Sequence, residues 1–108
     1  MAPDHPTLLL LSGGPDRPGA AALVARGTEA AQAGESLSVL LSDAGLAWAS
    51  DPRLEALAAY ESVAVGVCSA DARDAGWTLD ATPPFVAWSA LVSWLRDLEP
   101  GQRLWTAL

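Results

Sequence analysis

The sequence predicts an α/β protein, a three-layer sandwich with a mostly parallel five-stranded sheet of flavodoxin-like or Rossmann-like type. Short, wholly apolar runs alternate along the chain with longer segments of helical character. The runs are rich in Leu and Val without polar alternation, as is typical of strands buried on both faces. Capping residues, glycines and prolines separate the segments. Right-handed crossovers would then place helices on both faces of the sheet.

The first part of the chain predicts a tail, a strand and a helix. Residues 1–6 contain two prolines and are expected to be flexible, with His5 a solvated bystander and not a ligand. The apolar run at 7–12 predicts a central strand. Pro18 at the first helical position and Gly34 just past the last predict the ends of the following helix. Its buried face is expected to be built mostly of small residues: Ala20, Leu23, Val24, Gly27, Ala30 and Ala31.

A second strand is predicted at 36–42, followed by a loop at its carboxyl end. Residues 46–49 are compatible with either a short helical turn or a loop. A capping residue followed by proline, in Ser50-Asp51-Pro52, predicts a helix that continues through Tyr60. The Val-rich run 63–68 then predicts the third strand.

The third strand ends at Cys68 and passes directly into a segment of helix formers. Ser69 is the expected N-cap of this helix, and Gly76 its C-terminal stop. Two successive prolines make 77–84 a loop, because proline cannot donate to a sheet ladder.

The last part of the chain predicts one more helix between two strands. Residues 85–88 suit a short strand, after which Ser89 caps a helix at 90–98 with an apolar stripe at helical spacing. Pro100-Gly101 turns the chain, and 103–108 predicts the final strand.

Composition limits the possible functions. Its 108 residues suit one domain, 1–108. A net charge of -7, with arginine as the only basic residue besides His5, argues against nucleic acid or an anionic membrane as partner. No segment approaches a membrane span, the first residues do not resemble a signal peptide, and one cysteine cannot form an internal disulfide. We therefore expect a soluble cytoplasmic protein.

Cys68 is the candidate reactive group. The carboxyl end of a parallel strand is where open α/β sheets place their ligands. The amide groups at the start of the next helix stabilise a thiolate, as does Arg73, whereas Asp71 and Asp74 disfavour it. The sequence leaves the balance of these effects open.

Loops at the ends of the first two strands supply further candidates for substrate binding, with a simple turn at the glycines and a loop cap at Asp43 as the alternatives. Gly13-Gly14 follows the first strand and Asp43 the second. A flavodoxin-type strand order would make the first and third strands neighbours and place Gly13-Gly14 across a crevice from Cys68. The acidic Asp16 in this loop disfavours phosphate and hence a nucleotide.

Three serines, Ser12, Ser42 and Ser69, suggest a hydrolase, but the chain has no nucleophile-elbow motif and only one histidine. No metal site and no cofactor are expected.

These residues resemble the DsrE/DsrF-like family, whose fold is also called YchN-like. The similarity covers nearly the whole chain in the same element order. It lies in Leu8–Gly14, in Val39–Gly45, and in Val67-Cys68-Ser69 leading into Ala72–Gly76. It implies hexamers of similar subunits and, in several members, a cysteine that carries sulfur as a persulfide. Carried over to this chain, that role falls on Cys68 alone, with Ser69, Ala72, Arg73 and Gly76 as matching surroundings.

Two functions remain open at this point. In the first, Cys68 is a sulfur carrier that exchanges sulfane sulfur with a donor or acceptor protein or a small thiol, in a homo-oligomer (trimer or hexamer). In the second, the protein is a non-catalytic oligomeric binding or accessory protein with an inert Cys68. Trp94 and Trp105 are expected in the core, whereas Trp48, Trp77 and Trp88 would line a contact surface or the mouth of a pocket. A solvent-reachable Cys68 favours the first function and a sealed one the second.

Overall fold

The computed structural model describes residues 7–89 and 104–107, which form a five-stranded sheet with helices. Every strand pairing in this part of the chain is parallel. The predicted α/β class is confirmed. The strands are β1 (Thr7–Leu11), β2 (Leu37–Leu41), β3 (Val63–Cys68), β4 (Val86–Ser89) and β5 (Leu104–Ala107).

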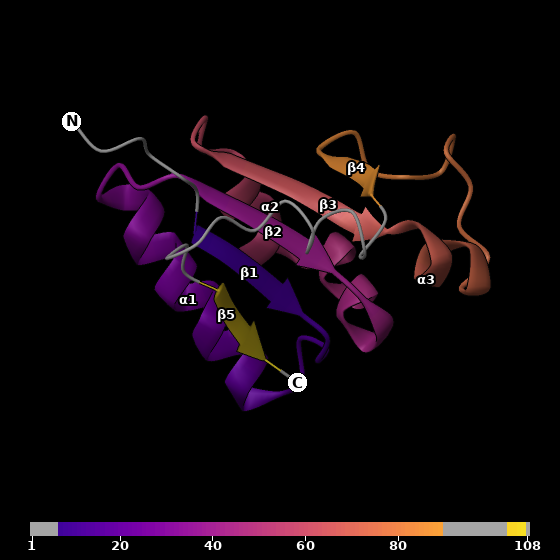
Figure 1. Ribbon diagram of the computed structural model, residues 1–108, viewed down its shortest axis with the longest axis horizontal. Coiled ribbons are helices and arrows are strands. Elements are labelled where there is room, and N and C mark those ends of the chain that lie inside the picture. The colour runs from indigo at the N-terminus through magenta and orange to yellow at the C-terminus, as the bar shows by residue number, and fades with distance from the viewer. Residues whose placement is uncertain (1–6, 90–103, 108) are drawn as a thin grey trace.

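Helices connect the first four strands, and Figure 1 shows α1 and α2 lying behind the sheet. The two contact each other, and α1 also packs on β1 and β5. The helix expected at 90–98 lies outside the described residues, as does the tail expected at 1–6. No helix in the described ranges is both long and apolar enough to cross a membrane. The helical elements are α1 (Pro18–Gln32), the 3₁₀ helix η1 (Asp43–Ser50), α2 (Pro52–Ala58) and α3 (Ser69–Asp74).

Helix α1 has the predicted ends and the predicted buried face. It starts at Pro18, and Gly34 follows it with a φ of 87°, a left-handed conformation that favours glycine. The six small and aliphatic residues expected on its inner face are the buried ones. Gly27 allows the closest approach to the sheet, since a Cβ there would lie 2.9 Å from the Leu9 side chain. The small face therefore brings the helix down onto β1.

The strand order is β4-β3-β2-β1-β5, so the flavodoxin-type order expected from the sequence is wrong. β1 lies between β2 and β5, and β3 lies between β2 and β4. The chain adds β2, β3 and β4 in one direction, and β5 pairs with the opposite side of β1. As a result, β2 separates the loop after β1 from Cys68, and no crevice joins them directly.

The two faces of the sheet are set by strand alternation. Leu9 faces α1, and its register partners Val39 and Val65 also belong to the buried core on that side. Val67 continues this row on β3. Cys68 is the next residue, so its side chain emerges on the face away from α1.

Three local expectations are corrected. Residues 43–50 form one 3₁₀ helix instead of a loop followed by an ambiguous turn. Ser69 is the first residue of α3 and not its N-cap, a position that Cys68 occupies. Trp48, expected at a surface or pocket mouth, is fully buried and belongs to the core. The other boundaries differ from expectation by a few residues at most; α2, for example, ends at Ala58 and not at Tyr60.

The described residues include three further tryptophans. Trp77, Trp88 and Trp105 are half-buried and pack against the core. Trp88 lies on β4 and Trp105 on β5, the two edge strands of the sheet. Trp94 lies outside the described residues.

Candidate functional site

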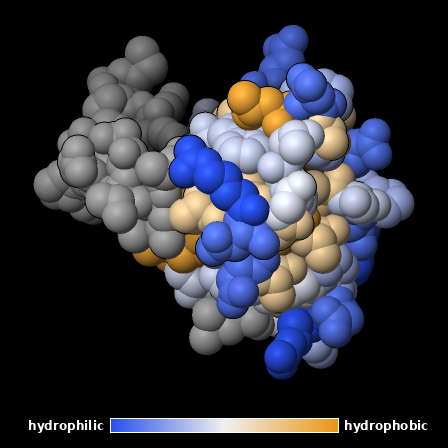
Figure 2. All heavy atoms as spheres, turned by 90° about the vertical axis from the view of Figure 1, so that its right-hand side faces the viewer, coloured by the Kyte–Doolittle hydropathy of each residue, from blue (hydrophilic) through white to orange (hydrophobic). Residues whose placement is uncertain are grey.

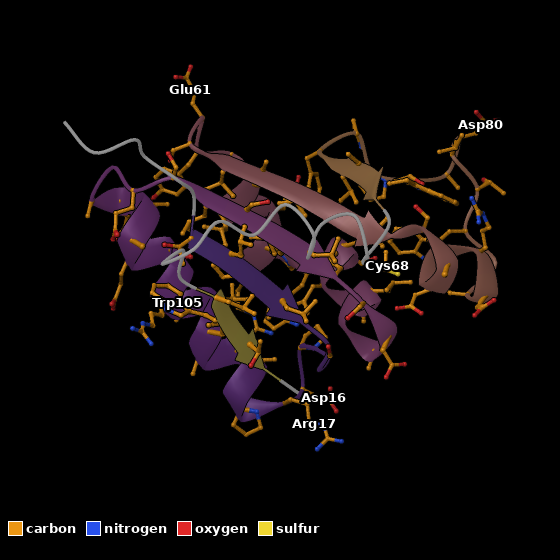
Figure 3. All side chains as sticks on the ribbon, in the orientation of Figure 1. Asp16, Arg17, Glu61, Cys68, Asp80 and Trp105 are labelled. Atoms are coloured by element: carbon orange, nitrogen blue, oxygen red, sulfur yellow. The ribbon has the colours of Figure 1, made fainter. Side chains whose placement is uncertain are left out.

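The carboxyl ends of β1, β2 and β3 lie side by side at one end of the sheet. The candidate residues directly follow these strands. Figure 3 shows Cys68 at the tip of β3, with Asp16 and Arg17 in the loop that follows β1. Figure 2 views the end of the molecule that lies on the right of Figure 1. Its visible surface is mainly hydrophilic or weakly hydrophobic, with only small strongly hydrophobic areas.

Cys68 is buried. Its exposed fraction is 5%, although it stands at the end of a strand. It occupies the N-cap position of α3, and its side chain makes no capping hydrogen bond. A buried thiol at this position can pack as a small hydrophobic side chain without reacting.

The parallel register adds two hydroxyl groups, those of Ser12 and Ser42, to the surroundings of Cys68. Leu11 pairs with Leu41, and Leu41 pairs with Val67, so the next residues Ser12, Ser42 and Cys68 are level on three adjacent strands. The Oγ atoms of the two serines are 3.0 Å apart, within hydrogen-bond distance. Ser42 is 5% exposed. The three side chains, two hydroxyls and a thiol, therefore form a row across the carboxyl ends of β1, β2 and β3.

A sequence signal for this row does exist. Each of its three residues directly follows an apolar run, in Leu11-Ser12, Leu41-Ser42 and Val67-Cys68. Their adjacency depends on the strand order, which differs from the flavodoxin-type order expected from the sequence.

The Gly13-Gly14 loop is held in place by hydrogen bonds from other parts of the protein. Both glycines are buried. The indole Nε1 of Trp48 donates a hydrogen bond of 3.0 Å to the Gly13 carbonyl, and Arg53 Nη2 donates one of 3.2 Å to the Pro15 carbonyl. These bonds fix the loop against η1 and α2, so its geometry is explained by a structural turn.

Asp43, which follows β2, is connected to α3 by a hydrogen bond from its backbone. Its φ of 50° is the left-handed conformation, which aspartate tolerates better than most residues. Its backbone N–H donates a 2.8 Å hydrogen bond to Oδ2 of Asp71 in α3. The exposed Asp43 side chain is thus held near the start of α3.

The other two predicted residues contribute little beside the thiol. Ser69 is half-buried in the first turn of α3. Arg73 is exposed in the last turn of that helix, away from Cys68 along the chain. The structure therefore brings Asp43 close to α3 but does not bring Gly13 and Gly14 next to Cys68.

Within residues 7–89 and 104–107, no group of three or more histidine, cysteine, aspartate or glutamate side chains could hold a metal ion.

Comparison with known proteins identifies the fold but no family. No family model matches the sequence, and no curated protein matches it. Two solved structures are similar. A conserved protein of unknown function from Bacteroides thetaiotaomicron has a TM-score of 0.70 and 12% identity, over 94% of each chain. A protein of unknown function from Methanobacterium thermoautotrophicum has a TM-score of 0.73 and 14% identity, over 95% of this chain and 100% of that one. At these identities the similarity concerns the fold alone.

Proposed function

We propose that this chain is a non-catalytic binding or accessory protein in which Cys68 is an inert, buried side chain. The observation that carries the proposal is the 5% exposure of Cys68. A sulfur-transfer reaction requires a donor sulfur to approach the thiolate in line, and the rate depends on this access. A buried thiol does not offer that approach.

The neighbouring hydroxyls support the same interpretation. Ser12 and Ser42 are hydrogen-bonded to each other, and both are level with Cys68 at the carboxyl ends of β1, β2 and β3. Cys68→Ala would leave only a small cavity there, and we expect it to cost about 1 to 2 kcal/mol of stability without a change of fold.

Thiol labelling tests the proposal. The native protein and the urea-unfolded protein are treated with the same small thiol reagent, and the labelling rates of Cys68 are compared. We expect slow labelling in the native state and fast labelling after unfolding. Equal rates in the two states would contradict the proposal.

A second candidate, a sulfur carrier or sulfurtransferase subunit, is favoured by a different observation. Cys68 ends a central strand at the carboxyl edge and directly precedes α3. In this mechanism the Cys68 thiolate attacks the outer sulfur of a donor persulfide. A new S–S bond forms on Cys68, the donor S–S bond breaks, and the donor leaves as a thiolate. An acceptor thiolate then takes the outer sulfur by the same reaction.

Mass spectrometry after incubation with a small persulfide donor separates the two candidates. The inert cysteine predicts an unchanged intact mass. A gain of one sulfur atom that is absent from Cys68→Ser would instead establish the carrier.

For both candidates we propose a cytoplasmic homo-oligomer, a trimer or hexamer. The mass in solution, measured by light scattering, tests the assembly, and a monomer at micromolar concentration would exclude it.

A further inference from the structure

A groove of about 410 Å³ lies between α1 and α2, on the side of the molecule that carries these helices. Its volume falls in the range of sites for small molecules, about 300 to 1,000 Å³. Its lining is mostly apolar and comes from both helices: Ala21, Val24, Ala25, Thr28, Arg53 and Ala56.

The space exists because the facing side chains are small. Ala21, Ala25 and Thr28 recur at helical spacing along one side of α1, and Ala56 lies on α2. Deeper residues fill the contact between the helices and the sheet, as the burial of Leu54 and Leu57 shows. The outer part of the helix pair is left as an apolar depression.

Arg53 lines this groove, and its guanidinium group has several contacts with the protein. Its Nε and Nη2 atoms each donate a 2.9 Å hydrogen bond to Asp51, and Nη2 also reaches the Pro15 carbonyl. The guanidinium carbon lies 4.7 Å from the centre of the Trp48 ring. A guanidinium group has five N–H donors in a fixed plane. The two N–H groups on Nη1 of Arg53 make no hydrogen bond within residues 7–89 and 104–107.

The other polar residue of the lining does not offer a donor. The Thr28 hydroxyl already donates a 2.9 Å bond to the Val24 carbonyl. The groove therefore combines apolar walls with the guanidinium group of Arg53, which keeps its charge and is paired through Nε and Nη2 with Asp51.

We propose that this groove binds a short aliphatic monocarboxylate. The hydrocarbon chain packs against the alanines and Val24, and the carboxylate accepts hydrogen bonds from Nη1 of Arg53. A charge-assisted bond of this kind favours the carboxylate over an alcohol of the same length. The site is remote in sequence from Cys68 and does not depend on the state of the thiol.

Octanoate, octanol and octylammonium are the probes for this site, and the readout is the change in backbone amide NMR signals during titration. We expect octanoate to shift signals of α1 and α2. Octanol should bind at least about tenfold more weakly than octanoate, and octylammonium should not bind. Equal binding of octanoate and octanol, or no shift with octanoate, would overturn the proposal.

A matched pair of variants locates the site. Ala25→Trp fills the groove, whereas Ala22→Trp places the same side chain on an exposed position of α1 that does not line it. Octanoate binding should be lost in the first variant and kept in the second. If both variants bind, or both fail while remaining folded by circular dichroism, the assignment is wrong. Cys68 labelling is a separate readout, so failure here leaves the proposed function to its own test.

Discussion

At the scale of single residues, Gly45 decides how closely η1 approaches the sheet. A Cβ atom at this position would overlap the carbonyl group of Leu11 at the end of β1. Backbone atoms cannot move aside as a flexible side chain can, so η1 would have to shift. The position requires glycine for steric reasons, since no left-handed φ is found there.

Gly45→Ala should therefore destabilise the protein by about 3 kcal/mol, the upper range of overpacking effects. Gly19→Ala is the matched control, because nothing lies within 4 Å of a Cβ built there in the first turn of α1. Alanine at that helical position should be neutral or stabilise by up to about 1 kcal/mol. Urea unfolding of both variants measures the difference, and equal free energies would contradict the steric account.

Trp48 links the core to the first loop through one polar bond. Its ring is fully buried, and its Nε1–H satisfies the buried carbonyl of Gly13. Trp48→Phe keeps much of the apolar contact but leaves this acceptor without its donor. We expect a loss of about 2 to 4 kcal/mol from the lost bond and the smaller ring, measured by thermal or urea unfolding. Trp105→Phe, at a half-buried position, should cost clearly less; a Trp48→Phe loss no larger than that of Trp105→Phe would contradict this account.

At the scale of elements, α2 is fixed at its start by Asp51 and Arg53. The Asp51 side chain caps the helix by accepting a hydrogen bond from the Arg53 backbone N–H. Its carboxylate also accepts two bonds from the Arg53 guanidinium. The side-chain hydrogen bonds from Arg53 are the main reason that the pKa of Asp51 lies below its ordinary value of 3.8.

A lowered carboxyl pKa stabilises the folded state above the unfolded pKa, and this contribution is lost as the pH falls through the folded pKa. Asp51→Asn keeps a capping group but removes the charge. We expect this variant to be less stable than the native protein at pH 7 and the difference to vanish well below pH 3.8. Because the Arg53 side chain is exposed, the effect should also shrink in high salt. A stability difference that does not change between pH 7 and pH 2.5 would exclude this role for the charge.

At the scale of the whole molecule, stability should be highest around β2. The three inner strands β1, β2 and β3 are each paired on both sides, whereas β4 and β5 are edge strands. We expect the amide protons of β2 to exchange with solvent most slowly and those of the edge strands several-fold faster, because edge pairings open without global unfolding. Hydrogen exchange followed by NMR measures these rates. Slower exchange in β5 than in β2 would contradict the expectation.

Features that depend only on a short stretch of the chain were well predicted from the sequence. Pro18 and Gly34 bound α1 as expected, and Gly76, with a φ of 82°, ends α3. The buried face of α1 followed from helical spacing alone. These features depend on backbone dihedral preferences and on periodicity, both of which are properties of short stretches.

The candidate site was only partly predictable. Cys68 was recognised at the end of its strand, but its burial and its neighbour Ser42 were not. Both depend on which strands are adjacent and which face the thiol occupies. The buried position of Trp48 was missed for the same reason, since its partner Gly13 lies 35 residues earlier in the chain.

By itself, the sequence determined the α/β class, the order and approximate bounds of the described strands, and the two ends of α1, because each follows from local conformational preference and apolar spacing. The tertiary structure decided the strand order, the row of Ser12, Ser42 and Cys68, the burial of the thiol, and the groove beside Arg53. All of these depend on contacts between segments that lie far apart in the chain. Such contacts are selected by the packing of the whole sheet, which no single stretch of the sequence contains.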